Sequence, residues 1–194
     1  LQSIQFLDRI ERNGRGWNLS LQTMDAIVCH NGEVHATRIA PERNRTFKDF
    51  DRMCGRMQSE PGFTPVPMTL EGCVVRMADT ISYIGRDLED AIRLGLIKRE
   101  QIPSLCREHL GKTNGTIVFS LVTDLIQNSL DQPWVGFSET VSSALKTLKD
   151  FNYRTIYKNP AIKRHLGSMA AMFEFVFHTC LNDLETGNRD SPIF

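Results

Sequence analysis

Apolar residues recur at three- and four-residue spacing along almost the whole chain, which is the periodicity of amphipathic helices. No segment alternates apolar and polar residues strongly enough to predict a strand, so we expect an all-α fold. Glycine, proline and Asn-Gly positions divide the pattern into separate helices. The predicted helices cover residues 1–11, 21–30, 69–94, 102–110, 114–129, 138–148, 155–159 and 161–184.

The segment between the second and third of these helices is polar and contains several prolines. We interpret residues 33–67 as one long loop that contains a short helix at 47–57, because loops of this length in a compact domain are often functional. The whole chain, 1–194, including this loop, is expected to form a single helical region. Helical phase is already present at Leu1, and the first residue is not Met. We therefore expect the sequence to be part of a longer protein.

Composition is that of an ordinary globular protein, with 41% hydrophobic and 24% charged residues and a formal net charge of zero. No overall positive charge favours nucleic acid, and no apolar run is long enough to span a membrane. The five cysteines are scattered and never form a CxxC pair. This pattern favours a reducing compartment over a disulfide framework or a zinc site, and we expect a cytoplasmic protein.

The longest predicted helix, which begins at Thr69, carries two stripes of residues. One is apolar and is expected to face the core. It consists of Leu70, Val74, Met77, Ile81, Ile84, Leu88 and Ile92. The other is polar and contains Arg76, Asp79, Tyr83, Asp87 and Asp90.

Asp79, Tyr83 and Asp87 are four residues apart and share one helix face. A carboxylate can bind a hard cation, a phenol ring can pack on a sugar, and a second carboxylate can accept hydrogen bonds from sugar hydroxyls. A solvated acidic face, balanced by neighbouring arginines, would show the same spacing. The glycines Gly72 and Gly85 lower helix propensity, which favours a closely packed neighbour or a ligand beside this helix.

The segment RMADTISYIGRDLEDAIRLGLI resembles the HD-domain deoxynucleoside triphosphate triphosphohydrolases, in which an Ala-Asp pair is followed by Ser-Tyr or Ala-Tyr and then by Asp-x-x-Asp-Ala. The upstream segment IERNGRGWNLSLQTMDAIVCHNG is similar to the same family. So are the downstream segments TNGTIVFSLVTDLIQNS and LKDFNYRTIYKN. The similarity therefore covers most of the chain. It implies an HD-domain-like helical bundle, of which this chain would be the C-terminal part.

The resemblance implies a role for each residue of the polar face. Asp79 would be the last ligand of a divalent metal ion such as Mg²⁺ or Mn²⁺. Tyr83 would line the sugar and phosphate site, and Asp87 would bind the deoxyribose 3'-hydroxyl. The implied reaction converts a deoxynucleoside triphosphate, such as dGTP, to deoxynucleoside and triphosphate. A metal ion in such a site polarises the α-phosphate and activates a water molecule.

The paired His-Asp motif of this family does not occur in the 194 residues. The other ligand His and the catalytic His and Glu are likewise expected before Leu1. Thr80 stands where several relatives place a basic residue next to the ligand Asp. One carboxylate cannot hold a catalytic metal alone, so this chain by itself is expected to be inactive and its parent chain active.

The sequence also supports predictions for four other groups of residues. His30 and His35 are interpreted as a helix-end cap and a loop residue, because their spacing does not place them on one helix face. The basic segment with Arg38, Arg43, Arg45 and Lys48 is expected to be solvated, or else to contact triphosphate, a second nucleotide or single-stranded nucleic acid. His165 and His178 are expected on the surface or in packing roles. Met169, Met172, Phe173, Phe175, Val176 and Phe177 are expected to pack in the core or at a subunit interface of a homo-oligomer.

Two alternative functions remain open at this level. One is another HD-type phosphohydrolase that acts on cyclic or alarmone nucleotides. The other is a helical assembly or regulatory module whose acidic stripe is only solvated. The residues do not indicate the preferred base.

Overall fold

A computed structural model of the chain describes residues 1–31, 34–164 and 166–193. Gly32, at which the predicted helix 21–30 is expected to have ended, and His165 lie outside these residues. The predicted all-α class is confirmed, since most of the described residues are helical. The longer helices are α3 (Leu21–Val28), α4 (Phe47–Ser59), α5 (Leu70–Arg93), α7 (Asn114–Ser129), α8 (Glu139–Asn152) and α10 (Leu166–Thr186).

Shorter elements connect these helices. At the N-terminus, α1 (Gln2–Gln5) continues into a π-helical turn η1 (Phe6–Ile10), and α2 (Glu11–Gly14) follows a break at Glu11. The remaining turns are η2 (Arg99–Gln101), α6 (Ser104–His109), η3 (Tyr153–Tyr157) and α9 (Pro160–Lys163). Two short strands that the periodicity did not predict, β1 (Arg38–Ile39) and β2 (Val135–Gly136), pair in antiparallel fashion.

Side chains at the helix starts explain where the main helices begin. Thr69 Oγ1 accepts a hydrogen bond from the Gly72 amide at the start of α5, and Ser138 Oγ accepts one from the Val141 amide at the start of α8. Such caps satisfy amides that have no partner within the helix. The sequence-based starts of both helices are thereby confirmed.

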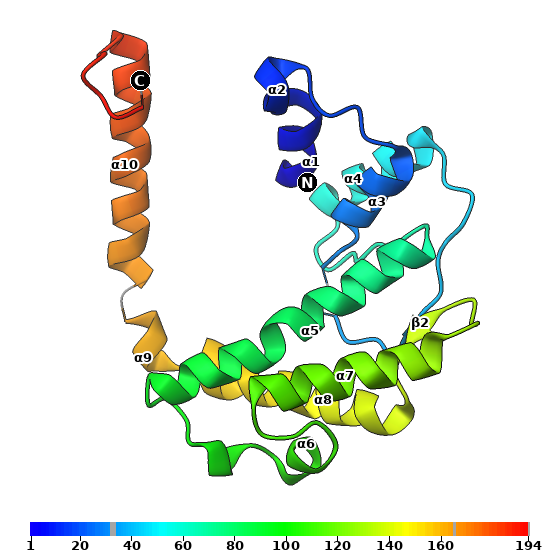
Figure 1. Ribbon diagram of the computed structural model, residues 1–194. Coiled ribbons are helices and arrows are strands. Elements are labelled where there is room, and N and C mark those ends of the chain that lie inside the picture. The colour runs from blue at the N-terminus through cyan, green and yellow to red at the C-terminus, as the bar shows by residue number, and fades with distance from the viewer. Residues whose placement is uncertain (32–33, 165, 194) are drawn as a thin grey trace.

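Helix α5 is the central element of the fold (Figure 1). It packs on α7 and α8 along one part of its length and on α3 at its N-terminal end. The main core lies between α5, α6, α7 and α8, and a smaller cluster lies between the N-terminal helices and α4. The apolar stripe of α5 is buried as predicted at Met77, Ile81, Ile84 and Leu88, but Val74 is exposed and Cys73 is buried in its place.

Two glycines within α5 have close neighbours. The sequence suggested either a closely packed neighbour or a ligand beside this helix, and the structure shows a neighbour at each glycine. A Cβ added at Gly72 would lie 2.8 Å from the Pro67 side chain, and one at Gly85 would lie 2.6 Å from Asn114 Oδ1. Both distances are shorter than real Cβ contacts allow. The glycines therefore let the preceding loop and the start of α7 approach α5 closely.

The loop between α3 and α5 is tied to the bundle by a buried ion pair. Arg45 donates to Asp25 of α3 and, through Nη2, to the carbonyl oxygen of Val66 at 3.1 Å. Asp25 also accepts a hydrogen bond of 2.7 Å from the Met68 amide. Arg45 is thus a structural residue, and the prediction of a solvated position is wrong for it.

The C-terminal prediction also needs correction. The expected helix 161–184 is divided into α9 and α10, and none of the described residues of α10 is buried. Its Met and Phe side chains are exposed to solvent, so they are not core residues of this structure. Within the described residues, no helix combines the length and apolar character that a bilayer crossing requires.

Candidate functional site

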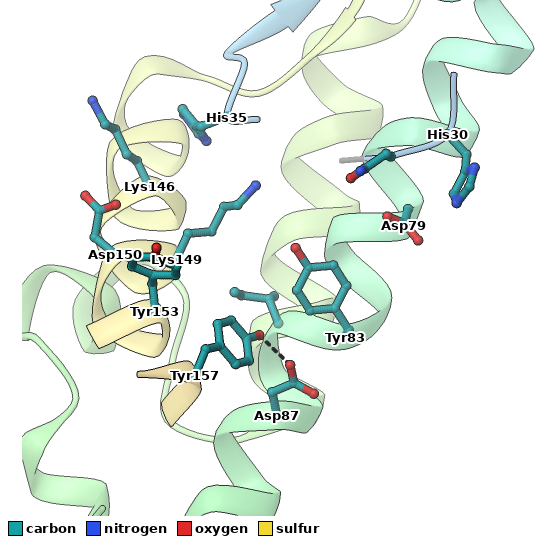
Figure 2. Close-up of a pocket in the computed structure, with 12 residues that line it drawn as sticks. His30, His35, Asp79, Tyr83, Asp87, Lys146, Lys149, Asp150, Tyr153 and Tyr157 are labelled. Atoms are coloured by element: carbon teal, nitrogen blue, oxygen red, sulfur yellow. Dashed lines mark hydrogen bonds between the residues drawn. The ribbon is translucent and has the colours of Figure 1, made fainter. Parts of the chain in front are cut away.

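A cavity of about 740 Å³ lies between α5 and α8 (Figure 2). Helix α5 contributes Asp79, Tyr83 and Asp87, the three residues that the four-residue spacing placed on one face. Each of them is half-buried, whereas Arg86 on the neighbouring face is exposed. A purely solvated face does not describe this arrangement, because all three half-buried side chains line one cavity.

The opposite wall comes from α8 and the turn η3. Lys146, Lys149 and Asp150 lie on α8, and Tyr153 and Tyr157 lie on η3. None of these five residues was predicted as a site residue from the sequence. A signal was present, however: Lys149, Tyr153 and Tyr157 are four residues apart and so share a face, as the three polar residues of α5 do.

The two walls meet at one end of the cavity, where the Tyr157 hydroxyl donates a hydrogen bond to Asp87 Oδ2 (Figure 2). This contact joins residues that are 70 positions apart in the sequence. Two aromatic rings, Tyr83 and Tyr157, therefore flank a carboxylate that accepts hydrogen bonds. Such a combination can pack on a sugar ring and bind one of its hydroxyls.

The other end of the cavity holds the cationic side chains. Lys149 is half-buried and extends into the space between α5 and α8, and Lys146 lies one turn earlier on α8 (Figure 2). Half-burial strengthens the attraction between an ammonium group and an anion, because the local dielectric constant is lower than in water. This end is suited to an anionic group such as a phosphate chain.

His30 and His35 both line the cavity, although the sequence placed neither in a site. His30 Nδ1 donates to the Ile27 carbonyl oxygen at 2.5 Å, so the prediction of a helix-end cap is confirmed. His35 Nε2 lies 2.9 Å from Ser142 Oγ, which lies 2.8 Å from Thr37 Oγ1. His35 is a loop residue, as predicted, and its contact with Ser142 holds its ring at the side of the cavity where the lysines lie.

The surroundings of His35 lower its pKa below the ordinary value of 6.5. Burial is the largest cause; Lys149 and then Lys146 add to it, and Asp150 opposes it. Because the pKa is lower in the folded than in the unfolded protein, the unfolded chain binds the proton first as the pH falls. The contribution of the neutral ring to stability is therefore complete above about pH 6.5 and is lost progressively below it.

We expect Lys149→Met to raise the pKa of His35, since it removes the cation that lowers this pKa more than Lys146 does. The shift should be partial, because burial remains the main cause of the low value. The pKa can be measured by following the His35 imidazole resonances by NMR as a function of pH. Lys112→Met, in the loop before α7, is the matched control and should leave the titration unchanged. An unchanged pKa in Lys149→Met would show that Lys149 does not face His35.

The described residues do not form a complete metal site. No group of three or more His, Cys, Asp or Glu side chains within these residues could hold a metal ion. Asp79 is one carboxylate, and His30 already uses Nδ1 for a backbone contact. Asp79 could therefore supply one metal ligand, but the described residues around it do not complete a coordination sphere.

The amino-acid sequence of the whole chain is similar to those of several known proteins. The chain is 29% identical over 187 residues to a deoxyguanosinetriphosphate triphosphohydrolase-like protein of Desulfatibacillum aliphaticivorans, covering 95% of this chain and 47% of the relative. Proteins with the same name from Clostridium perfringens and Clostridium tetani are 30% and 28% identical, over 80% and 94% of this chain and 39% and 47% of their own lengths. The chain is similar to deoxyguanosinetriphosphate triphosphohydrolase-like proteins. The resemblance predicted from the sequence is thereby confirmed.

These triphosphohydrolase-like relatives are about twice as long as the chain, which spans less than half of each of the three. No family model matches the chain, and no solved structure does. The names of the relatives support a triphosphohydrolase-like enzyme as the broad class.

Proposed function

We propose that this chain supplies the sugar- and phosphate-binding wall of an enzyme that hydrolyses a deoxynucleoside triphosphate to deoxynucleoside and triphosphate. One observation carries the proposal. Asp79, Tyr83 and Asp87 of α5 face Lys149 and Tyr157 across a single cavity. The names of the relatives add the substrate class, because they refer to deoxyguanosine triphosphate.

In this proposal the substrate lies along the cavity with its sugar at the Tyr157 end. Asp87 accepts a hydrogen bond from the 3'-hydroxyl of the sugar. A carboxylate has room for this bond beside the one that it accepts from Tyr157. The ring of Tyr83 packs beside the sugar. Holding the sugar at this end directs the phosphates toward Lys149 and His35, where they meet donors and positive charge.

The implied divalent metal does not fit the residues of this chain alone, since no metal-binding cluster exists among the described side chains. We propose that Asp79 contributes one ligand and that the remaining ligands, with the catalytic acid and base, come from outside residues 1–194. The isolated chain is then expected to bind a deoxynucleotide without hydrolysing it.

The proposal that Asp87 binds the 3'-hydroxyl is tested by measuring how two variants change the affinity for a deoxynucleoside triphosphate and for its 2',3'-dideoxy analogue. Asp87→Ala should weaken binding of a deoxynucleoside triphosphate by about tenfold, which is the effect of losing one hydrogen bond to a charged group. Binding of the 2',3'-dideoxy analogue should change little, because it has no 3'-hydroxyl to lose. Isothermal titration or NMR titration of the 194-residue chain measures both affinities.

Asp90→Ala is the matched control, because Asp90 lies on the same helix but is exposed and does not line the cavity. It should leave both affinities unchanged. If Asp87→Ala weakens the binding of both analogues equally, Asp87 does not bind the 3'-hydroxyl. If the purified chain releases triphosphate on its own, the proposal that the catalytic groups lie outside it is wrong.

A further inference from the structure

Helix α10 is the most exposed apolar element of the described chain. None of its 21 residues is buried, and it extends away from the bundle (Figure 1). Its exposed apolar side chains include Phe173, Phe175 and Phe177, with 66%, 72% and 64% of their surface accessible. An exposed apolar surface of this length is typical of an interaction site, because leaving such side chains in water is unfavourable.

Most of the apolar residues of α10 lie on one face, whereas Met172 and Phe175 lie outside it. With about 100° per residue, the residues of this face occupy a sector about 140° wide. This face consists of Leu166, Met169, Ala170, Phe173, Val176, Phe177, Cys180, Leu181 and Leu184. Glu174, His178, Asn182 and Glu185 lie outside it. A helix with a polar side and an apolar stripe buries the stripe against another element.

The apolar face is nearly symmetric about position 175. Eight of the nine residues of this face form four pairs that are equally far from this position and similar in size and polarity, and the exception is Val176, whose counterpart is Glu174. The pairs are Leu166 with Leu184, Met169 with Leu181, Ala170 with Cys180, and Phe173 with Phe177. A surface with this symmetry is complementary to itself when two copies are related by a two-fold axis that makes the helices antiparallel.

The charges at the ends of the helix have the same complementarity. Lys163 and Arg164 precede α10, whereas Asp183 and Glu185 lie in its last turn. An antiparallel pair brings the basic end of one helix beside the acidic end of the other, and it does so at both ends. A parallel pair would place like charges together.

We propose that α10 is a dimerisation helix, which binds α10 of a second copy of this chain in antiparallel orientation. Self-association is favoured over another partner because both the apolar pairs and the end charges match under the same two-fold operation. Another set of exposed apolar residues, Phe119, Val122 and Ile126 of α7 with Leu130 directly after it, has no such symmetry. This proposal does not depend on the proposed enzymatic function.

The mass of the 194-residue chain in solution tests the proposal. Sedimentation equilibrium should show a dimer, and the double variant Phe173→Glu/Phe177→Glu should be monomeric with unchanged helix content by circular dichroism. Unchanged helicity is expected because neither residue packs in the core. The control Phe119→Glu/Ile126→Glu changes two equally exposed residues of α7 and should remain dimeric. A monomeric native chain, or a dimer that persists in the α10 double variant, would overturn the proposal.

Cysteine cross-linking tests the orientation. In an antiparallel pair, position 170 of one copy lies at the level of Cys180 of the other. Ala170→Cys should therefore give a covalent dimer through residues 170 and 180 under mild oxidation with copper phenanthroline. Ala170→Cys/Cys180→Ser should not form this dimer. A disulfide between the two residues at position 170 would instead show parallel helices and would contradict the antiparallel arrangement.

Discussion

Asp25→Ala is expected to lower the free energy of unfolding by about 3–5 kcal/mol, which is the usual effect of removing one partner of a buried ion pair. Asp25 is fully buried and accepts hydrogen bonds from Arg45 and from the Met68 amide. Its removal leaves the Arg45 guanidinium charge without its buried partner. The Met68 amide also loses its acceptor. Urea denaturation followed by circular dichroism measures the change.

Glu42→Ala is the control for this experiment. Glu42 also forms an ion pair with Arg45, at 3.0 Å, but its side chain is 65% exposed. An exposed pair of this kind contributes less than about 1 kcal/mol. If Asp25→Ala and Glu42→Ala reduce stability equally, the buried ion pair is not what holds the loop.

The ion pair also shows why the sequence could not predict the role of this loop. Arg45 stands in a basic segment that also contains Arg38, Arg43 and Lys48, and nothing in the local pattern distinguishes it from them. Its partner Asp25 lies 20 positions away on α3, among polar and apolar neighbours. Local periodicity reports which face a residue occupies, but it does not report which distant charge that face meets.

The helices and the wall formed by α5 were predictable because both depend on local spacing. Asp79, Tyr83 and Asp87 share a face wherever α5 packs, so the sequence was sufficient to group them. The opposite wall required the long-range contact between α5 and α8. Spacing groups Lys149 and Tyr157 on one face of their own segment, but their position across the cavity from α5 follows from packing.

The C-terminal helix illustrates a different limit. Its Met- and Phe-rich pattern was compatible with a core position or with a subunit interface, because both require an apolar face. Periodicity cannot distinguish a partner within the molecule from one outside it. The exposure of α10 excludes the core position among the described residues and leaves the interface as a proposal.

Lys149→Ala is expected to weaken the binding of a deoxynucleoside triphosphate by about 100-fold, while leaving the binding of the deoxynucleoside almost unchanged. The expected loss is that of a hydrogen-bonded contact between a half-buried cation and a multiply charged anion, about 2–3 kcal/mol. In our proposal Lys149 contacts the phosphates and the sugar lies at the Asp87 end of the cavity. The two affinities can be measured by titrating the chain with each ligand.

Two further variants make this test specific. Lys112→Ala changes the net charge by the same amount at a distance from the cavity, so it controls for long-range attraction of the anion. Lys149→Arg keeps the charge and should retain more affinity than Lys149→Ala. If Lys149→Ala and Lys112→Ala have equal effects, the attraction is a property of the whole surface and Lys149 is not a phosphate-binding residue. If Lys149→Ala weakens binding of the deoxynucleoside and the triphosphate equally, the ligand lies in the opposite direction along the cavity, and the assignment of Asp87 to the 3'-hydroxyl fails with it.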